Sequence, residues 1–293
     1  MNRLTLILAF IIAFPLIGNA QRKRAFMVGI SKYHTNGYKV WNNIHGAEDV
    51  ALLTPELEKK GFKVKALTNE QATYQAIFNA LNSFIVASKK GDIIYLHFSC
   101  HGQPVEDGLN GMVKDEKDSL DEALVPIDAG KTYNVNGYKG EKHLTDDQLN
   151  VYISKLRKKI GSTGMLYVAM DACHIGEASR VGLETVRGTN EVLTSRPNYK
   201  YNPPKSNIKH YSIEREKDMA PALFIEACQS RERNTEIRIN GKEYGALSYN
   251  IYHALKGLKS FDHTTKNQFK ANVDASTKEK GRWPRTQTLV FEE

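Results

Sequence analysis

The chain has 293 residues, of which 41% are hydrophobic and 25% are charged, and its formal net charge is +8. This composition supports a sizeable core in one large or two small α/β domains, and no repeat or low-complexity tract suggests a fibrous or disordered protein. The positive charge admits a nucleic-acid partner, but no basic stretch is interleaved with stacking aromatic residues. We therefore expect a solvated basic exterior and no nucleic-acid partner.

Residues 1–20 have the pattern of a signal peptide. Arg3 precedes an almost wholly apolar stretch over 4–17, and small residues at 18–20 fit a signal peptidase. A membrane anchor or a buried N-terminal helix is the alternative, but the stretch is short for a span and Pro15 interrupts it. We therefore expect export to the periplasm or the outside of the cell, with no stable membrane span after the segment is removed.

The remaining elements follow from hydrophobic spacing and from capping residues. Val50, Leu53 and Leu57 recur at a helical period, whereas short apolar runs that stop at polar or Gly residues indicate buried strands. In chain order we predict a strand over 24–30, a helix over 47–60, a strand over 64–67, a helix from Asn69 or Thr73 to Ala87, a strand over 92–99, loops over 103–145 around 123–126, a helix over 146–159, a strand over 165–170, a long irregular segment over 180–215, a strand over 222–225 and a helix over 246–258.

The alternation of strands and helices predicts an α/β fold. Its largely parallel sheet would have helices on both faces, and no interior linker suggests a second globular domain. Two of the apolar strands end at reactive residues: residues 92–99 lead into Cys100, His101 and Gly102, and residues 165–170 lead into 171–174. Open α/β sheets place ligands beyond the carboxyl ends of their strands. If these two strand ends are neighbours, an imidazole lies beside a thiol. A nucleophilic thiol and a nearby base are the groups that a cysteine hydrolase needs for catalysis.

Each of these residues also has a purely structural interpretation. Cys173 could be a buried structural thiol and His101 a satisfied core histidine, but their positions at strand ends favour a nucleophile and a general base. His174 is a candidate base by adjacency, although adjacent residues near a strand end point apart. Cys100 is a candidate nucleophile that fails on the same ground.

The segment Ser99-Cys100-His101-Gly102 resembles the histidine motif of the caspase-like cysteine peptidases. Residues 171–176 resemble their cysteine motif, which reads Asp-x-Cys-His-Ser-Gly in the metacaspase and orthocaspase branch, and differ from it only at Ile175. Four further segments resemble family segments in family order, namely 27–33, 46–49, 121–128 and 241–255. The resemblance implies a caspase-like fold over a single domain, residues 21–293, with a long basic loop at about 180–217.

The resemblance also implies roles. Cys173 would attack a peptide carbonyl and form a thioester, His101 would act as general base and acid, and the backbone N–H groups of Gly102 and Cys173 would bind the oxyanion. Asp171, Asp49 and Ser99 would line the primary pocket, whose two acids favour cleavage after Arg or Lys. Asp49 could instead be an ordinary acid at a helix N-terminus.

Calcium is the one cofactor that the resemblance raises. Some metacaspases bind it through acids similar to Asp121, Asp146 and Asp147, but the fourth family acid falls on Arg180, and two of the acids also suit a first helical turn. We therefore expect no cofactor and calcium-independent activity.

The basic loop predicts self-cleavage, because exposed loops are where nicking concentrates. Its basic residues are Arg187, Arg196, Lys200, Lys205 and Lys209.

The resemblance and the charge of the pocket together predict the overall function. We expect a monomeric cysteine endopeptidase that cleaves proteins or peptides after Arg or Lys. The alternatives are the same fold with Asp specificity and a catalytically silent binding or assembly module, which Ile175 weakly supports. The three cysteines lack metal-ligand spacing, and the sequence leaves open whether Cys100 and Cys228 form a disulfide.

Overall fold

The computed structural model describes residues 21–33, 41–109, 120–173, 185–199, 201–202 and 216–293. At its centre is a six-stranded sheet in the order β11-β8-β7-β3-β1-β2, parallel except for the edge strand β11. Its strands are β1 (Lys23–Gly29), β2 (Phe62–Thr68), β3 (Ile93–Ser99), β7 (Met165–Asp171), β8 (Ala222–Glu226) and β11 (Val290–Glu292). The predicted parallel sheet is thereby confirmed.

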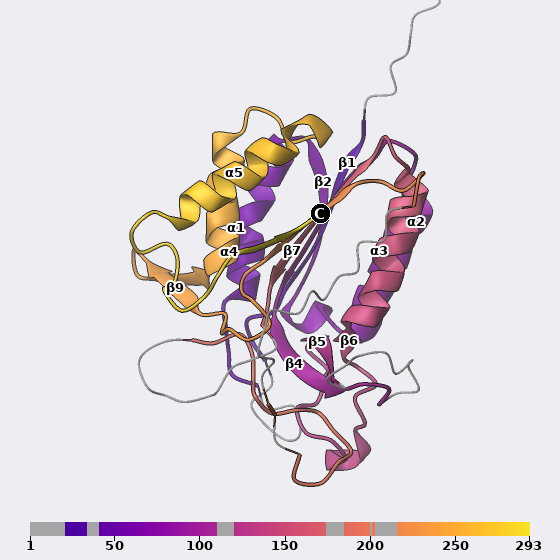
Figure 1. Ribbon diagram of the computed structural model, residues 1–293, viewed down its shortest axis with the longest axis vertical. Coiled ribbons are helices and arrows are strands. Elements are labelled where there is room, and N and C mark those ends of the chain that lie inside the picture. The colour runs from indigo at the N-terminus through magenta and orange to yellow at the C-terminus, as the bar shows by residue number, and fades with distance from the viewer. Residues whose placement is uncertain (1–20, 34–40, 110–119, 174–184, 200, 203–215) are drawn as a thin grey trace, which may run out of the picture.

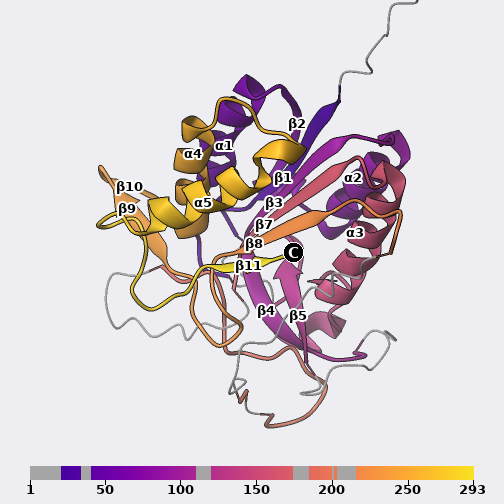
Figure 2. The same cartoon turned by 45° about the horizontal axis from the view of Figure 1, so that its top comes forward.

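Helices cover both faces of this sheet (Figures 1 and 2). One face carries α1 (Gly46–Lys59), α4 (Ala246–Gly257) and α5 (Lys266–Thr277), and the other carries α2 (Tyr74–Ala87) and α3 (Asp146–Ile160). Alternate residues of each central strand enter the two cores: Leu96 packs on the α2–α3 side and Tyr95 on the opposite side. Burial on both faces explains why these strands are continuous apolar runs.

Thr73 is the N-cap of α2, which decides between the two candidate caps. Its side chain accepts a hydrogen bond from the backbone N–H of Ala76 at 3.2 Å. Asn69 instead begins a short 3₁₀ helix, η2 (Asn69–Gln71). Two further 3₁₀ helices are η3 (Val135–Gly137) and η4 (His263–Thr265).

The prediction of loops over 103–145 is wrong in part. A small antiparallel sheet forms from β4 (His101–Glu106), β5 (Leu120–Val125) and β6 (Leu144–Thr145). Its apolar side chains Val105 and Ala123 pack with Tyr138 and Leu193 in a small separate cluster. Most residues of β4 and β5 are buried, but the Gly and charged residues of this region interrupt the apolar pattern and concealed the strands.

A hairpin near the C-terminus was also missed. Strands β9 (Glu236–Ile239) and β10 (Lys242–Gly245) pair antiparallel through Asn240 and Gly241, whose φ angles are 49° and 79°. Asn-Gly with positive φ at both positions is the preferred two-residue hairpin turn, so the sequence did contain a signal. The helix α5 was missed because only three of its residues are buried.

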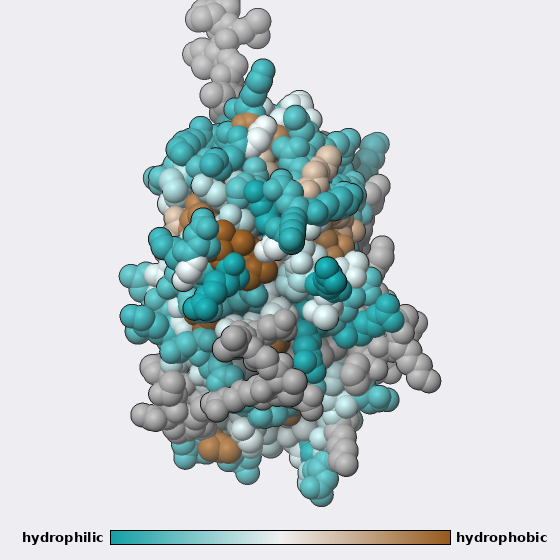
Figure 3. Space-filling model, turned by 90° about the vertical axis from the view of Figure 1, so that its left-hand side faces the viewer, coloured by the Kyte–Doolittle hydropathy of each residue, from teal (hydrophilic) through white to brown (hydrophobic). Residues whose placement is uncertain are grey.

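The predicted signal peptide, residues 1–20, lies outside the described residues. Within the part of the chain that the structure describes, every helix is too short or too polar to cross a membrane. The side of the molecule that carries α4, α5 and the β9–β10 hairpin is mainly hydrophilic, with small hydrophobic areas (Figure 3). This face agrees with a solvated exterior.

Candidate active site

Parallel register brings the two reactive strand ends together. Ser99 at the end of β3 aligns with Gly29 of β1 on one side and with Asp171 of β7 on the other. His101 follows Ser99 by two residues, and Cys173 follows Asp171 by two. The structure therefore places the predicted imidazole and thiol on neighbouring strand ends.

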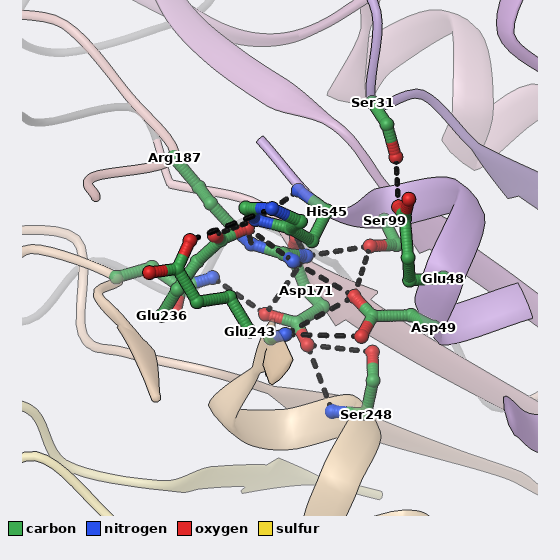
Figure 4. Close-up of polar contacts among 12 residues, drawn as sticks. Ser31, His45, Glu48, Asp49, Ser99, Asp171, Arg187, Glu236, Glu243 and Ser248 are labelled. Atoms are coloured by element: carbon green, nitrogen blue, oxygen red, sulfur yellow. Dashed lines mark hydrogen bonds and ion pairs between the residues drawn. The ribbon is translucent and has the colours of Figure 1, made fainter. Parts of the chain in front are cut away.

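Arg187 of the chain itself occupies the predicted acidic pocket (Figure 4). Its side chain is completely buried, and Nη2 lies 2.8 Å from Asp49 Oδ2. Nη1 donates to Ser99 Oγ at 2.5 Å and lies 3.6 Å from Asp171 Oδ1. The expectation that the basic loop is exposed is thus wrong for Arg187, because its guanidinium is bound among carboxylates beneath the surface.

A third acid, Glu236, completes this pocket. Its Oε1 accepts hydrogen bonds from Arg187 Nε at 3.0 Å and from Nη2 at 2.7 Å. Glu236 begins β9, far from the catalytic motifs in sequence, so no local pattern singled it out. The hairpin turn that follows β9 was the signal that could have directed attention there.

Asp49 and Asp171 are themselves held by the C-terminal half of the chain. The backbone N–H of Gly245 donates to Asp49, and Ser248 donates both its backbone N–H and its hydroxyl to Asp171 Oδ2, at 2.8 and 2.6 Å. Asn234 Nδ2 donates to Asp171 Oδ1 at 2.7 Å. Because Asp49 is buried and contacts Arg187, its interpretation as a simple helix N-terminal acid is insufficient.

Burial and the neighbouring charges have opposing effects on the pKa values of the pocket groups. Burial by itself would lower the pKa of Arg187, but the charges of Asp49, Asp171 and Glu236 raise it above its usual value. Burial raises the pKa of Asp49 to about 7, although Arg187 opposes this effect. For Glu236, burial favours protonation, but Arg187 and His45 together hold its pKa below the usual value. A buried cation is therefore the natural occupant of this pocket.

The segment that carries Arg187 is bound as an extended strand. The backbone N–H of Arg187 donates to Asn234 O at 2.9 Å, and that of Glu236 donates to Thr185 O at 2.9 Å. Val186 and Thr235 form an antiparallel bridge between these two bonds. This arrangement is β-strand addition, a common way of binding extended peptides.

Two N–H groups converge on the carbonyl of Arg187. Gly102 donates to this oxygen at 3.1 Å and Cys173 at 3.2 Å. They are the two groups that the sequence predicted for the oxyanion. The peptide bond between Arg187 and Gly188 therefore lies directly between the histidine turn and the cysteine turn.

His101 is held in one orientation by aromatic rings. The ring centroids of Tyr33 and Trp41 lie 4.9 and 5.2 Å from that of His101. Nε2 lies 2.8 Å from the carbonyl oxygen of Asn42, which can only accept, so Nε2 carries the hydrogen. Nδ1 has no hydrogen-bond partner among the described residues, and burial lowers the pKa of His101 to about 4. The imidazole is neutral, with its lone pair on Nδ1.

All three cysteines are free thiols, so Cys100 and Cys228 form no disulfide. Cys173 is buried, donates from Sγ to Glu232 O at 2.8 Å and packs against Cys228. Burial raises the pKa of Cys100 to about 12, which makes it a poor nucleophile. The alternative base His174, together with Ile175 and Arg180, lies outside the described residues.

The predicted calcium acids occupy one region at the small sheet. Asp121 lies in β5 and Asp146 begins α3, and both are buried; Asp147 is partly buried. The β5–β6 register, which pairs Ala123 with Thr145, places them near one another. Carboxylate oxygens are suitable ligands for a hard cation such as calcium. The ligand set expected from the resemblance, however, also includes position 180, where this chain has Arg.

A second cluster of possible metal ligands consists of His45, Glu236 and Glu243. His45 Nδ1 lies 2.6 Å from Glu236 and Nε2 lies 3.4 Å from Glu243. The hydrogen bond to Glu236 raises the pKa of His45 above its usual value. An imidazole that faces a carboxylate at each nitrogen acts as a donor, so this cluster is better explained as an ion-pair network.

Comparison with known proteins agrees with this geometry. A family model of the caspase domain matches residues 22–283. Metacaspase-1B of Aspergillus fumigatus is 30% identical over 169 residues, which are 54% of this chain and 36% of the relative. Metacaspase-2 of Arabidopsis thaliana is 29% identical over 166 residues, which are 53% of this chain and 35% of the relative.

One solved structure extends the comparison across nearly the whole chain. Protein GSU0716 from Geobacter sulfurreducens superposes with a TM-score of 0.59 at 18% identity, over 92% of each chain, and supports the fold alone. The chain spans about a third of the length of the curated metacaspases named above. The predicted caspase-like fold is confirmed, and the matched family model shows that the chain belongs to the caspase-domain family, with metacaspases among its relatives.

Proposed function

We propose that the protein is a cysteine endopeptidase that cleaves after Arg or Lys, and that its own bond between Arg187 and Gly188 is a substrate. One observation carries this proposal. The guanidinium of Arg187 lies among Asp49, Asp171 and Glu236, while its carbonyl oxygen accepts hydrogen bonds from Gly102 and Cys173. A side chain in an acidic pocket and a carbonyl between two N–H donors are the two requirements for a bound substrate.

The chemistry follows from the groups around that carbonyl. His101 Nδ1 takes the proton of the Cys173 thiol, which gives up its hydrogen bond to Glu232. The thiolate attacks the Arg187 carbonyl, and the N–H groups of Gly102 and Cys173 stabilise the oxyanion. His101 then protonates the amine of Gly188, which leaves. Water hydrolyses the remaining thioester and releases the carboxylate of Arg187.

Self-cleavage here also implies latency. Arg187 fills the pocket, and residues 185–187 occupy the edge that an extended substrate would pair with. Other substrates enter only after this segment has been cut and has left. Among the other basic residues of the loop, Arg196 pairs with Glu106 at 3.4 Å and stacks on Tyr199. The three lysines at 200, 205 and 209 lie outside the described residues.

A panel of fluorogenic peptides with Arg, Lys or Asp at the cleaved position tests the proposal. We expect turnover of the basic peptides and none of the Asp peptide, because three buried carboxylates repel an acidic side chain. Turnover of the Asp peptide alone would exclude the pocket assignment. A folded protein that cleaves none of the three would instead be the catalytically silent module.

Chelation of calcium should leave the activity unchanged. Apart from water, every group that the mechanism above requires is a side chain or backbone group of the chain itself. The measurement is the initial rate on the Arg peptide in excess EGTA and again after calcium is added back. A rise on adding calcium would refute this expectation and make Asp121, Asp146 and Asp147 the candidate ligands of an activating ion.

Replacement of Tyr33 by Phe should slow the chemical step. Tyr33 Oη accepts from the backbone N–H of His101 at 3.0 Å and donates to Val125 O at 2.8 Å. Loss of both bonds loosens the histidine turn without touching substrate, so kcat should fall about 10-fold while KM changes little. Tyr167→Phe, which removes a similar bond to Asp262 on the far core, is the matched control.

We further propose that the mature chain begins at Gln21, is exported and is monomeric. The apolar segment and the small residues at 18–20 support the first two statements. N-terminal sequencing of the protein from its native cells, followed by size-exclusion chromatography with light scattering, tests all three. An intact Met1 on the native protein would contradict removal of the segment.

A further inference from the structure

We infer that Glu236 makes the primary pocket selective for Arg over Lys. This inference rests on the proposed function, because it concerns the side chain that the same pocket accepts. The sequence motifs supplied Asp49 and Asp171, which by themselves attract either basic side chain. Glu236 comes from a different element, β9, and contacts the Nε of the guanidinium in addition to a terminal nitrogen.

The contacts of Nε differ from those of the two terminal nitrogens, while Nη2 is shared by Asp49 and Glu236. Asp49, Asp171 and Ser99 contact only the terminal nitrogens Nη1 and Nη2. Glu236 Oε1 contacts the edge formed by Nε and Nη2, at 3.0 and 2.7 Å. Figure 4 shows Glu236 beside Arg187, across from the two aspartates. A donor at the Nε position exists in Arg and not in Lys, which has a methylene there.

Glu236 is fixed in the position that recognises this edge. Its side chain is almost fully buried, and Oε1 also accepts from the backbone N–H of His45 at 2.7 Å. The other oxygen, Oε2, lies 2.6 Å from His45 Nδ1. With both oxygens engaged, the carboxylate is held against rotation and has little freedom to follow a different side chain.

A lysine in this pocket would leave one acidic group without a charged partner on the bound side chain. Its single ammonium can approach the aspartates or Glu236, but its stem offers no second donor to the remaining group. Loss of a charge-assisted hydrogen bond costs more free energy for a buried carboxylate than for one at the surface. We therefore expect the pocket to favour Arg over Lys by about 10- to 100-fold.

Recognition of the main chain is separate from this selection. The backbone N–H of Glu236 donates to Thr185 O, and this bond does not depend on the side chain at 236. Substitutions at Glu236 therefore change the pocket and leave the strand pairing of the substrate in place. That separation permits a test within the chain itself, with the bond after residue 187 as the substrate.

The experiment is a double-mutant cycle on self-cleavage. The full chain, Arg187→Lys, Glu236→Gln and the double variant are synthesised in a cell-free system with a pulse of label, and loss of the intact chain is followed. Arg187→Lys should slow cleavage by about 10- to 100-fold in the natural background and by less than about 3-fold in the Glu236→Gln background. Glu48→Gln is the matched control, because Glu48 accepts from Ser31 and does not contact Arg187.

The outcomes separate this inference from the proposed function. If the natural chain stays intact in a folded state, the proposed self-cleavage fails. If the natural chain and Arg187→Lys are cut at equal rates, the proposed function stands and the role of Glu236 is wrong. Should Glu236→Gln fail to fold, Glu236→Asp, which keeps the charge but withdraws it from the guanidinium edge, replaces it in the cycle. An unchanged preference for Arg in Glu236→Asp would also overturn the inference.

Discussion

Wild-type protein is expected to separate into two pieces between Arg187 and Gly188, whereas Cys173→Ala should remain a single chain. The Arg187 carbonyl accepts from the Cys173 N–H at 3.2 Å, and removal of the thiol leaves no nucleophile at this position. Loss of a catalytic nucleophile typically lowers the rate by about 10³-fold or more. Mass spectrometry and N-terminal sequencing that reads Gly188-Thr189-Asn190 would measure the result.

Two further variants make this result specific. Cys100→Ala removes another buried thiol from a neighbouring strand end, and it should be cut as the wild type is. Arg187→Ala keeps Cys173 but removes the side chain that the pocket binds, so the bond after residue 187 should stay intact. If Cys173→Ala material is nicked as readily as the wild type, self-cleavage is wrong.

Asp171→Asn should lose most turnover of Arg peptides. The substitution removes a buried negative charge next to the bound guanidinium, and its new amide faces donors, since Ser248 and Asn234 both donate to Asp171. Disruption of a buried ion pair costs about 3–5 kcal/mol, which corresponds to about 150- to 5,000-fold in kcat/KM. Steady-state kinetics on the Arg peptide measures this loss, and thermal unfolding reports the accompanying destabilisation.

Asp92→Asn is the matched control for this charge. Asp92 is a buried acid that precedes β3, at the opposite end of the sheet, and both its oxygens bind Arg22 at 2.9 and 2.5 Å. Its replacement should lower the unfolding temperature and leave kcat/KM within about 3-fold of the wild-type value. Equal losses of activity in Asp171→Asn and Asp92→Asn would show that the effect comes from folding and not from the pocket.

The central strands and the helices that cover them were predictable because their sequence patterns are local. The runs over 92–99 and 165–170 are apolar throughout, since alternate side chains enter two cores, and α1 keeps a helical period of buried residues. Elements with few buried side chains carried weaker signals. Three-residue β11 was therefore missed. The strands β4 and β5 were missed for a different reason: most of their residues are buried, but polar residues and Gly interrupt their apolar pattern.

The sequence by itself determined which residues could react and which strand ends would carry them. His101 and Cys173 follow apolar strands directly, so their placement depends only on neighbours in the chain and on the register of a parallel sheet. Only the tertiary structure decided what fills the pocket. A basic loop residue is normally solvated, and nothing near Arg187 in sequence indicates that its guanidinium is buried. The carboxylates that bind it come from positions 49, 171 and 236. These positions are far apart in the chain, and only the folded structure brings them together around one side chain.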